Sequence, residues 1–216
     1  MVNLVLRILL VAVVFLSSFS GVFSPASAVM LNVPLVPQKL DNWCWAATAE
    51  MVKNYLNPEL HVQQCAEVNA ALEADAAAST TPPGQAVAPV NCCPLPQDDE
   101  TLARCDTVGW PRFVAPDFKA EDSSLAPPPM MSWSDVKKEI GVAHRPFVYV
   151  RKDVGGGGHI VVIQGYGRDN GVRYVLVNDP WPVNEGKTSW YTYAWYSAQG
   201  RHLRDIHSIT YTGSDK

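Results

Sequence analysis

The sequence has no surplus of positive charge, no collagen-like glycine period and no C-x-x-C pair among its five cysteines. Its 17 basic and 21 acidic residues give a net charge of −4, which argues against a protein that binds nucleic acid through a basic face. The absence of C-x-x-C spacing disfavours a four-cysteine zinc site. The remaining features, 216 residues of which 47% are hydrophobic, fit one globular domain with one good core.

The first segment has the pattern of a secretory signal peptide. Residues 4–16 are almost wholly apolar with Arg7 as their one charge, and an A-x-A cleavage pattern follows at Ala26-Ser27-Ala28. We expect cleavage after Ala28, which gives a secreted or periplasmic protein with a mature domain of residues 29–216 and no stable membrane association. The alternative is an uncleaved membrane anchor, because the apolar stretch extended through Phe23 is close to spanning length.

Four of the five cysteines cluster between Cys65 and Cys105, and Cys44 stands apart. In an oxidising compartment this predicts two disulfides and one free thiol. A bond between the neighbours Cys92 and Cys93 would be strained. Two pairings therefore stay open, 65–92 with 93–105 and 65–93 with 92–105.

Helical patterns dominate the first half of the chain. We expect helices from near Cys44 to Asn57, over 61–77 and 98–104, and from Ser132 or Ser134 to Ile140. Residues 31–38 are expected to be extended, because their two prolines disfavour a helix. Residues 60–130 are expected to form a Cys- and Pro-rich insertion of helices and loops, with loops over 79–96 and 106–130.

Strand patterns dominate the second half. Five β-branched and aromatic segments between turn residues predict strands over 147–151, 159–163, 173–177, 190–196 and 206–212. Asp169-Asn170-Gly171 predicts a hairpin between two of them. Helices first and antiparallel strands later predict an α+β fold, in which a helical half with a central helix bearing Cys44 packs on the sheet half and a cleft lies between them.

Four polar residues could together form a site for catalysis by a thiol. Cys44 lies at the expected start of a helix, where unpaired N–H groups favour a thiolate. His159 opens a strand and could be the base, and Asp179 follows the next strand and could orient that base. Gln38, six residues before Cys44, could fold back over the helix start and donate a hydrogen bond to an oxyanion.

Three segments, in this order, resemble papain-like cysteine peptidases. The segment from Gln38 to Cys44-Trp45-Ala46 resembles their Gln-x5-Cys-Trp-Ala nucleophile segment, and His159 to Gly165-Tyr166-Gly167 resembles their catalytic-histidine strand. Asp179-Pro180-Trp181 resembles their third catalytic residue with its shielding tryptophan. The resemblance covers residues 33–56 and 132–182 and is greatest to bacterial branches: staphopains, C39-like peptidases and papain-fold effector proteases of plant pathogens.

Two features depart from the papain pattern. The third catalytic position is Asp179, as in the C39-like branch, where papain and the staphopains have Asn; Asn178 is a rival for the role, although the Pro-Trp alignment favours Asp179. Only about five residues separate the expected cleavage site from the first extended segment, too few for an inhibitory propeptide of papain type. We therefore expect any latency to be imposed in another way.

The resemblance implies a papain-like fold and a secreted, monomeric cysteine peptidase that acts on polypeptides without a cofactor or metal. Cys44 would attack the scissile carbonyl, His159 would transfer the proton and Asp179 would orient His159. Gln38 and the backbone N–H of Cys44 would bind the oxyanion. The alternatives are another thiol acyl-transfer enzyme, such as a peptidoglycan amidase or a transglutaminase, and a papain-fold binding or toxin-like module with little turnover.

Overall fold

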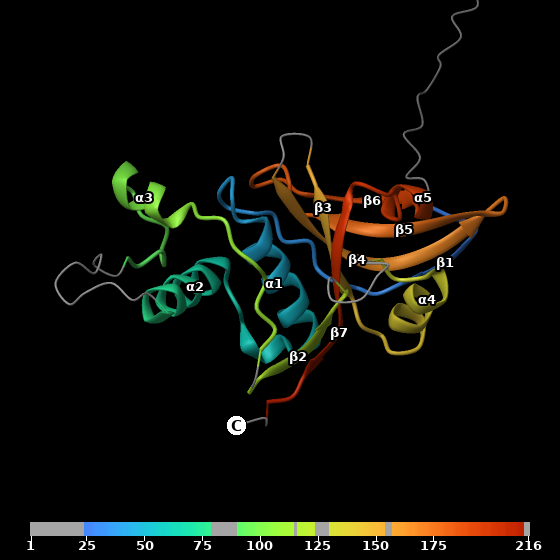
Figure 1. Ribbon diagram of the computed structural model, residues 1–216, viewed down its shortest axis with the longest axis horizontal. Helices are drawn as coiled ribbons and strands as arrows, with labels where there is room; N and C mark the ends of the chain where they lie inside the picture. The colour runs from blue at the N-terminus through green and yellow to red at the C-terminus, as the bar shows by residue number, and fades with distance from the viewer. Residues whose placement is uncertain (1–23, 79–89, 115, 124–129, 154–156, 214–216) are drawn as a thin grey trace, which may run out of the picture.

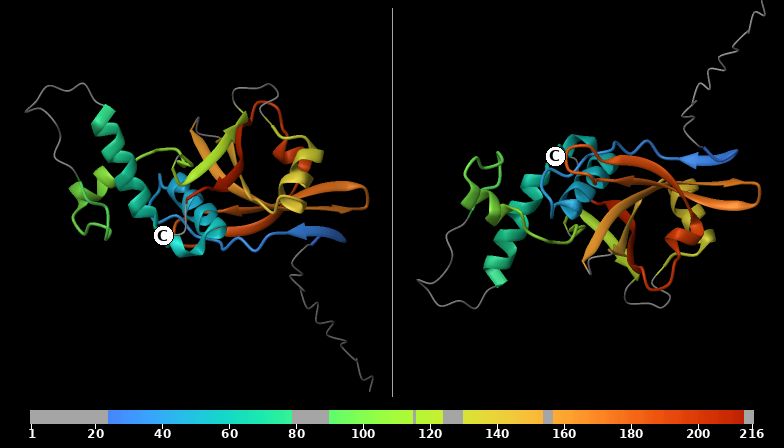
Figure 2. Two further views of the ribbon diagram at one scale, coloured as in Figure 1. Left: turned by 90° about the horizontal axis from the view of Figure 1, so that it is seen from below. Right: turned by 90° about the horizontal axis from the view of Figure 1, so that it is seen from above.

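A computed structural model describes residues 24–78, 90–114, 116–123, 130–153 and 157–213 (Figure 1). The helices α1 (Cys44–Leu56), α2 (Gln64–Ala78) and α3 (Asp99–Cys105) lie together, and a seven-stranded sheet lies beside them. The two further views agree that α2 and α3 are at one end of the molecule and the β4–β5 hairpin is at the other (Figure 2). The expected α+β class, a helical half packed on an antiparallel sheet half, is confirmed.

The sheet is antiparallel at every pairing and runs in the order β2-β7-β3-β4-β5-β6, with β1 paired to β4 outside this path. The predicted hairpin is confirmed, since Asn170 and Gly171 join β4 to β5 with φ angles of 46° and 82°. Both residues tolerate the positive φ that a two-residue hairpin requires. The strands are β1 (Ser27–Met30), β2 (Phe118–Asp122), β3 (Phe147–Lys152), β4 (Gly158–Asp169), β5 (Val172–Asp179), β6 (Lys187–Thr192) and β7 (His202–Tyr211).

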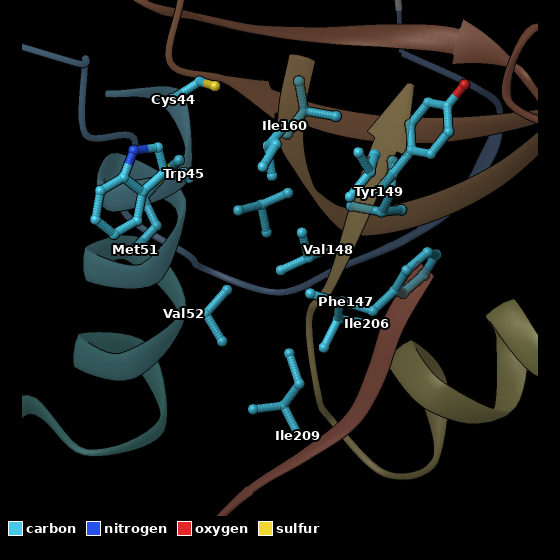
Figure 3. Packing of buried hydrophobic residues seen from close by; sticks show 14 of the residues in the cluster. Cys44, Trp45, Met51, Val52, Phe147, Val148, Tyr149, Ile160, Ile206 and Ile209 are labelled. Carbon is cyan, nitrogen blue, oxygen red and sulfur yellow. The ribbon is translucent and has the colours of Figure 1, made fainter. Parts of the chain in front are cut away.

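The central helix α1 carries Cys44 and packs against β4 and β7. Its apolar residues recur at helical spacing and are buried, and Val52 faces Val148 of β3 (Figure 3). The helix ends where Asn57, with φ −148° and ψ 98°, precedes Pro58 and so leaves the helical region. Because Cys44 is the first residue of this helix, the packing of α1 on the sheet fixes the position of the thiol.

Two disulfides cross-link the insertion, and a buried ion pair attaches it to α1. The disulfides are Cys65–Cys93 and Cys92–Cys105, which is the second of the two pairings left open by the sequence. Lys53 of α1 lies 2.7 Å from a carboxylate oxygen of Glu67 in α2. The ion pair holds α2 against the second half of α1, and the disulfide at Cys105 ties the end of α3 to the rest of the insertion.

Three elements differ from the sequence-based expectation. Residues 193–196 form the short helix α5 (Tyr193–Tyr196) instead of continuing a strand, because the hydroxyl of Thr192 accepts a hydrogen bond from Trp195 N and caps a helical turn. The strand β2 lies inside the expected loop 106–130 and pairs with β7. The strand β1 begins at Ser27, before the expected cleavage site.

The remaining helix, α4 (Trp133–Gly141), begins at the first of the two predicted caps. The hydroxyl of Ser132 accepts a hydrogen bond from Asp135 N at 3.2 Å. In the part of the chain that the structure describes, no helix reaches the length and hydrophobicity of a transmembrane span. Residues 4–16, the core of the expected signal peptide, lie outside the described residues.

Candidate active site

Cys44 is the first residue of α1, and its side chain is the free thiol among the five cysteines. It is 9% exposed, and its sulfur lies at the N-terminal end of the helix (Figure 3). The first N–H groups of a helix have no partner within the helix and carry a partial positive charge. The fold therefore places the thiol where a negative charge on sulfur is stabilised.

His159 and Asp179 meet where β4 begins and β5 ends. His159 is the second residue of β4, and Asp179 is the last residue of β5, which runs antiparallel to it. Nε2 of His159 lies 2.7 Å from Oδ1 of Asp179, and both residues are buried. The backbone N–H of Trp181 also donates to Oδ1, at 3.0 Å, which fixes this carboxylate further.

The surroundings of His159 favour its protonated form. Burial works to lower the pKa of His159, but hydrogen bonds to Asp179 and Cys44, with the negative charges of both, raise this pKa to about 9. Burial likewise works to raise the pKa of Asp179, whereas its hydrogen bond to His159 and the charge there lower it below the ordinary value. The imidazole thus bonds Asp179 through Nε2, which leaves its Nδ1 side for Cys44.

Asn178, the rival of Asp179, is fully buried and is bonded elsewhere. Its Oδ1 accepts hydrogen bonds from Gln164 Nε2 and from Thr188 Oγ1, and its Nδ2 donates to Val33 O at 2.9 Å. These partners come from β4, β6 and the extended segment before α1. The structure therefore brings Asp179, and not Asn178, to the ring of His159.

Gln38 is 1% exposed and holds the turn that precedes Cys44. Its Nε2 donates to Leu40 O at 2.8 Å and to Asp41 O at 2.7 Å, while its Oε1 is buried without a hydrogen-bond partner among the described residues. Both N–H groups of the amide are thus engaged by backbone carbonyls, and Gln38 is not among the residues that line the cleft. Its backbone N–H donates to Pro180 O at 3.0 Å, next to Asp179.

A cleft of about 580 Å³ opens at Cys44 and His159. One side is formed by the sheet, with Val150, Arg151 and Ile160. Residues 107–110 of the Cys-rich insertion, here called the insertion wall, also line the cleft. A Cβ atom at Gly109 would lie within 3 Å of ring atoms of Trp45, so the wall lies directly against α1.

The insertion wall is held by the two tryptophans that flank Cys44. Trp43 Nε1 donates to Cys105 O at 2.8 Å, and Trp45 Nε1 donates to Thr107 O at 3.1 Å. Sequence reasoning missed this wall because the insertion matches no motif; the only signal was the pair of tryptophans, whose indole N–H groups need acceptors when buried. Across the described ranges, no group of three or more His, Cys, Asp or Glu side chains could hold a metal ion.

Comparison with known proteins gives distant similarities only. No protein-family model matches the chain, and no curated protein matches it. The chain is similar to a solved structure from a study of the mite allergens Blo t 1 and Der p 1, with 13% identity over 91% of this chain and 74% of that one and a TM-score of 0.48. It is also similar to digestive procathepsin L 3 of the Tenebrio molitor larval midgut, with 12% identity over 90% of this chain and 72% of that one and a TM-score of 0.47. Likeness at this level assigns the chain to no family, and its function is therefore inferred from the site.

Proposed function

We propose that this protein is a papain-like cysteine peptidase that hydrolyses peptide bonds with Cys44 as nucleophile. One observation carries the proposal: Nε2 of His159 bonds Asp179 at 2.7 Å, and His159 lines the same cleft as Cys44, whose side chain helps to raise the pKa of His159. A nucleophile, a base and a group that orients the base, brought together at one cleft, are the parts that covalent acyl transfer needs.

The first half of the reaction forms an acyl-enzyme. The thiolate of Cys44, paired with the imidazolium of His159, attacks the carbonyl carbon of the scissile bond. His159 then gives its proton to the leaving amine as the C–N bond breaks. In the second half, neutral His159 takes a proton from water, the resulting hydroxide attacks the thioester, and the proton returns to the pair as the acid product leaves. Asp179 keeps the ring aligned in both halves.

We assign the oxyanion site to the backbone N–H of Cys44 and the side-chain amide of Gln38. Cys44 is the first residue of α1, where the N–H has no acceptor within the helix. Gln38 can contribute only if its amide exchanges one of its bonds to Leu40 O and Asp41 O for a bond to the oxyanion. The backbone N–H is therefore the donor that is already in place.

We further propose that the protein is exported and acts outside the cytoplasm after removal of residues 1–28. Two disulfides, Cys65–Cys93 and Cys92–Cys105, favour an oxidising compartment. The sheet and the insertion wall both line the cleft of about 580 Å³ at Cys44, and we propose a polypeptide as the substrate.

The test is hydrolysis of a peptide library by the purified exported protein, with active-site titration by an epoxide thiol trap. We expect one equivalent of the trap on Cys44, loss of hydrolysis in parallel with labelling, and no hydrolysis by Cys44→Ala. Hydrolysis that persists in Cys44→Ala would overturn the proposal. So would a trap that never reacts together with a library that stays intact, which is the behaviour of a binding module.

A further inference from the structure

Arg151 lies beside His159 on the sheet, within the cleft. The two residues are Cα partners in the antiparallel pairing of β3 and β4. Side chains of such partners leave the sheet on the same face, with Cβ atoms about 5 Å apart. Arg151 also lines the cleft together with Cys44 and His159. A permanent positive charge therefore stands next to the reacting groups.

The guanidinium of Arg151 has hydrogen-bonding capacity to spare. Its Nε is buried without a hydrogen-bond partner among the described residues. Its Nη1 lies 3.7 Å from Oδ1 of Asp153, which is beyond hydrogen-bonding distance. The side chain of Arg151 is 21% exposed, whereas that of Asp153 is 52% exposed, so a contact of this kind stabilises little. The buried Nε cannot reach a ligand in the cleft, but Nη1, which makes only this long contact with Asp153, can donate to a second anionic partner.

The carboxylates that line the same cleft lie closer to solvent. Asp41 is exposed, and the side chain of Asp75 is 75% exposed and pairs with Arg112 at 3.3 Å. Arg112 itself is 39% exposed. Apart from the Cys44–His159 pair, Arg151 is thus the least exposed charged side chain in the lining of the cleft.

We propose that Arg151 binds a carboxylate of the peptide substrate close to the scissile bond, and so determines specificity in this cleft. The inference rests on the proposed function. A guanidinium offers parallel N–H groups that fit a carboxylate, and such charge-assisted bonds are stronger than neutral ones. The carboxylate can belong to a Glu or Asp side chain or to the C-terminus of the substrate, and both present the same group to Arg151.

The experiment measures kcat/KM for two series of internally quenched peptides. In the first series, one position at a time on either side of the scissile bond carries Glu, Gln or Lys. In the second, the peptide ends in a free carboxylate or an amide at increasing distance from that bond. We expect roughly a tenfold preference for the carboxylate at one position, the size expected for a hydrogen bond to a charged group in a partly exposed site.

The variants Arg151→Gln and Arg151→Glu decide whether Arg151 causes this preference. We expect Arg151→Gln to abolish the ratio between carboxylate and neutral peptides, and Arg151→Glu to reverse it in favour of Lys. The matched control is Arg168→Glu, an exposed arginine on β4 outside the cleft, which should keep the wild-type ratio. Circular dichroism melting of each variant checks that it folds.

The outcomes separate this inference from the proposed function. If neutral peptides are hydrolysed but no carboxylate preference appears, or the preference survives in Arg151→Glu, the role of Arg151 is wrong and the peptidase stands. If no peptide is hydrolysed and Cys44 is not labelled by the thiol trap, the peptidase proposal fails and the inference fails with it. A preference confined to the free C-terminus would identify the terminal carboxylate as the group that is bound.

Discussion

His159 is held in its protonated form by its two partners, and this has a measurable consequence for activity. Because the pKa of His159 is raised to about 9, the imidazolium that donates to the leaving amine is present at neutral pH and is lost as pH rises through that value. We expect the alkaline limb of the kcat/KM profile near pH 9. Asp179→Asn removes one cause of the raised pKa, so it should move that limb to lower pH. An alkaline limb that Asp179→Asn leaves in place would contradict the pairing.

The same shift contributes to stability. The pKa of His159 in the folded protein lies above the unfolded value of about 6.5, so its contribution is fully present below that value and is lost as pH rises through about 9. Asp179 has the opposite sign: its lowered pKa contributes stability above the unfolded value, which is lost on acidification. Both contributions are therefore fully present between the unfolded pKa of Asp179 and the unfolded pKa of His159.

Asn178 and Asp179 are neighbours with different roles, and their alanine variants should separate activity from stability. Asn178→Ala removes the partner of two buried groups, Nε2 of Gln164 and Val33 O, and each buried unsatisfied group costs about 1–3 kcal/mol of unfolding free energy. Asp179→Ala removes the group that orients His159, and kcat should fall by roughly 10²–10⁴. The measurements are thermal unfolding and kcat per titrated thiol. A large fall in kcat per titrated thiol in Asn178→Ala, with Asp179→Ala near normal, would reverse the assignment.

Gln38 can act on the oxyanion, on the turn before Cys44, or on both. If it donates to the oxyanion, Gln38→Ala should lower kcat by roughly 10²–10³. Loss of its bonds to Leu40 O and Asp41 O should also lower the unfolding free energy by about 1–3 kcal/mol. We expect kcat to fall much further than the rate at which iodoacetamide alkylates Cys44. Equal falls in both rates would mean that Gln38 acts only by holding the turn.

At the scale of elements, the insertion wall depends on a disulfide that lies close to the thiol. Cys105 is bonded to Cys92, and its backbone carbonyl accepts the indole N–H of Trp43, the neighbour of Cys44. Cys65–Cys93 lies in the same insertion, but neither of its cysteines accepts a hydrogen bond from these two indoles. The two disulfides therefore offer a matched comparison.

Replacing both cysteines of each disulfide by alanine should show different effects on substrate binding. Either double variant should lose about 2–4 kcal/mol of unfolding free energy, the usual contribution of a disulfide. If the wall contacts the proposed peptide substrate, Cys92→Ala with Cys105→Ala should in addition raise KM more than it lowers kcat. The check is steady-state kinetics on a peptide substrate, with Cys65→Ala plus Cys93→Ala as the control. Equal KM values in the two double variants would show that the disulfide at Cys105 does not support the wall.

The elements that the sequence predicts well have strong local signals. The helix α1 has apolar spacing and a proline stop, and the β4–β5 hairpin has an Asn-Gly turn. The helix α5 could not be predicted, since its aromatic residues favour a strand and only the hydroxyl of Thr192 turns the chain into a helix. The strand β2 exists through its pairing with β7, a partner more than 80 residues away that no local pattern reveals.

In the candidate site, too, some features follow from local sequence signals and others depend on long-range strand pairing. The motif segments place Cys44, His159 and Asp179 together because each lies at the end of a strongly predicted element. The choice between Asn178 and Asp179 depends on which face of β5 meets His159, and this is set by the register of β4 and β5. The role of Arg151 depends on its pairing with His159 across β3 and β4, which is likewise a matter of register.

At the scale of the whole molecule, both faces of the sheet are covered at β3, the strand that pairs with the His159 strand β4. Val148 faces α1, and Phe147 and Tyr149 point away from it (Figure 3), where they pack on Tyr196 of α5. A buried polar group completes this second face, since the hydroxyl of Tyr196 donates to Asp205 of β7. Packing on both faces of the sheet keeps the position of His159 fixed relative to Cys44 on α1.

The N-terminal segment pairs with the sheet through β1. The position of the expected cleavage can therefore be tested on the exported protein. In the structure, Ser27 and Ala28 pair with Arg168 and Gly167, and Leu31 N donates to Gln164 O at 2.8 Å. Cleavage after Ala28 removes the first two pairs of β1 and keeps Leu31 attached to β4. We expect N-terminal sequencing of the exported protein to begin at Val29, and its intact mass to match residues 29–216 with two disulfides.

The same sample tests the state of the cysteines. Native alkylation without reductant should add one adduct, on Cys44, because the other four cysteines are paired in the structure. Two or more adducts, or labelling within the insertion, would contradict the disulfide pairing. A protein that keeps residues 4–16 and sediments with membranes would show that the first segment is an anchor, and the active site would then face its substrate from a membrane surface.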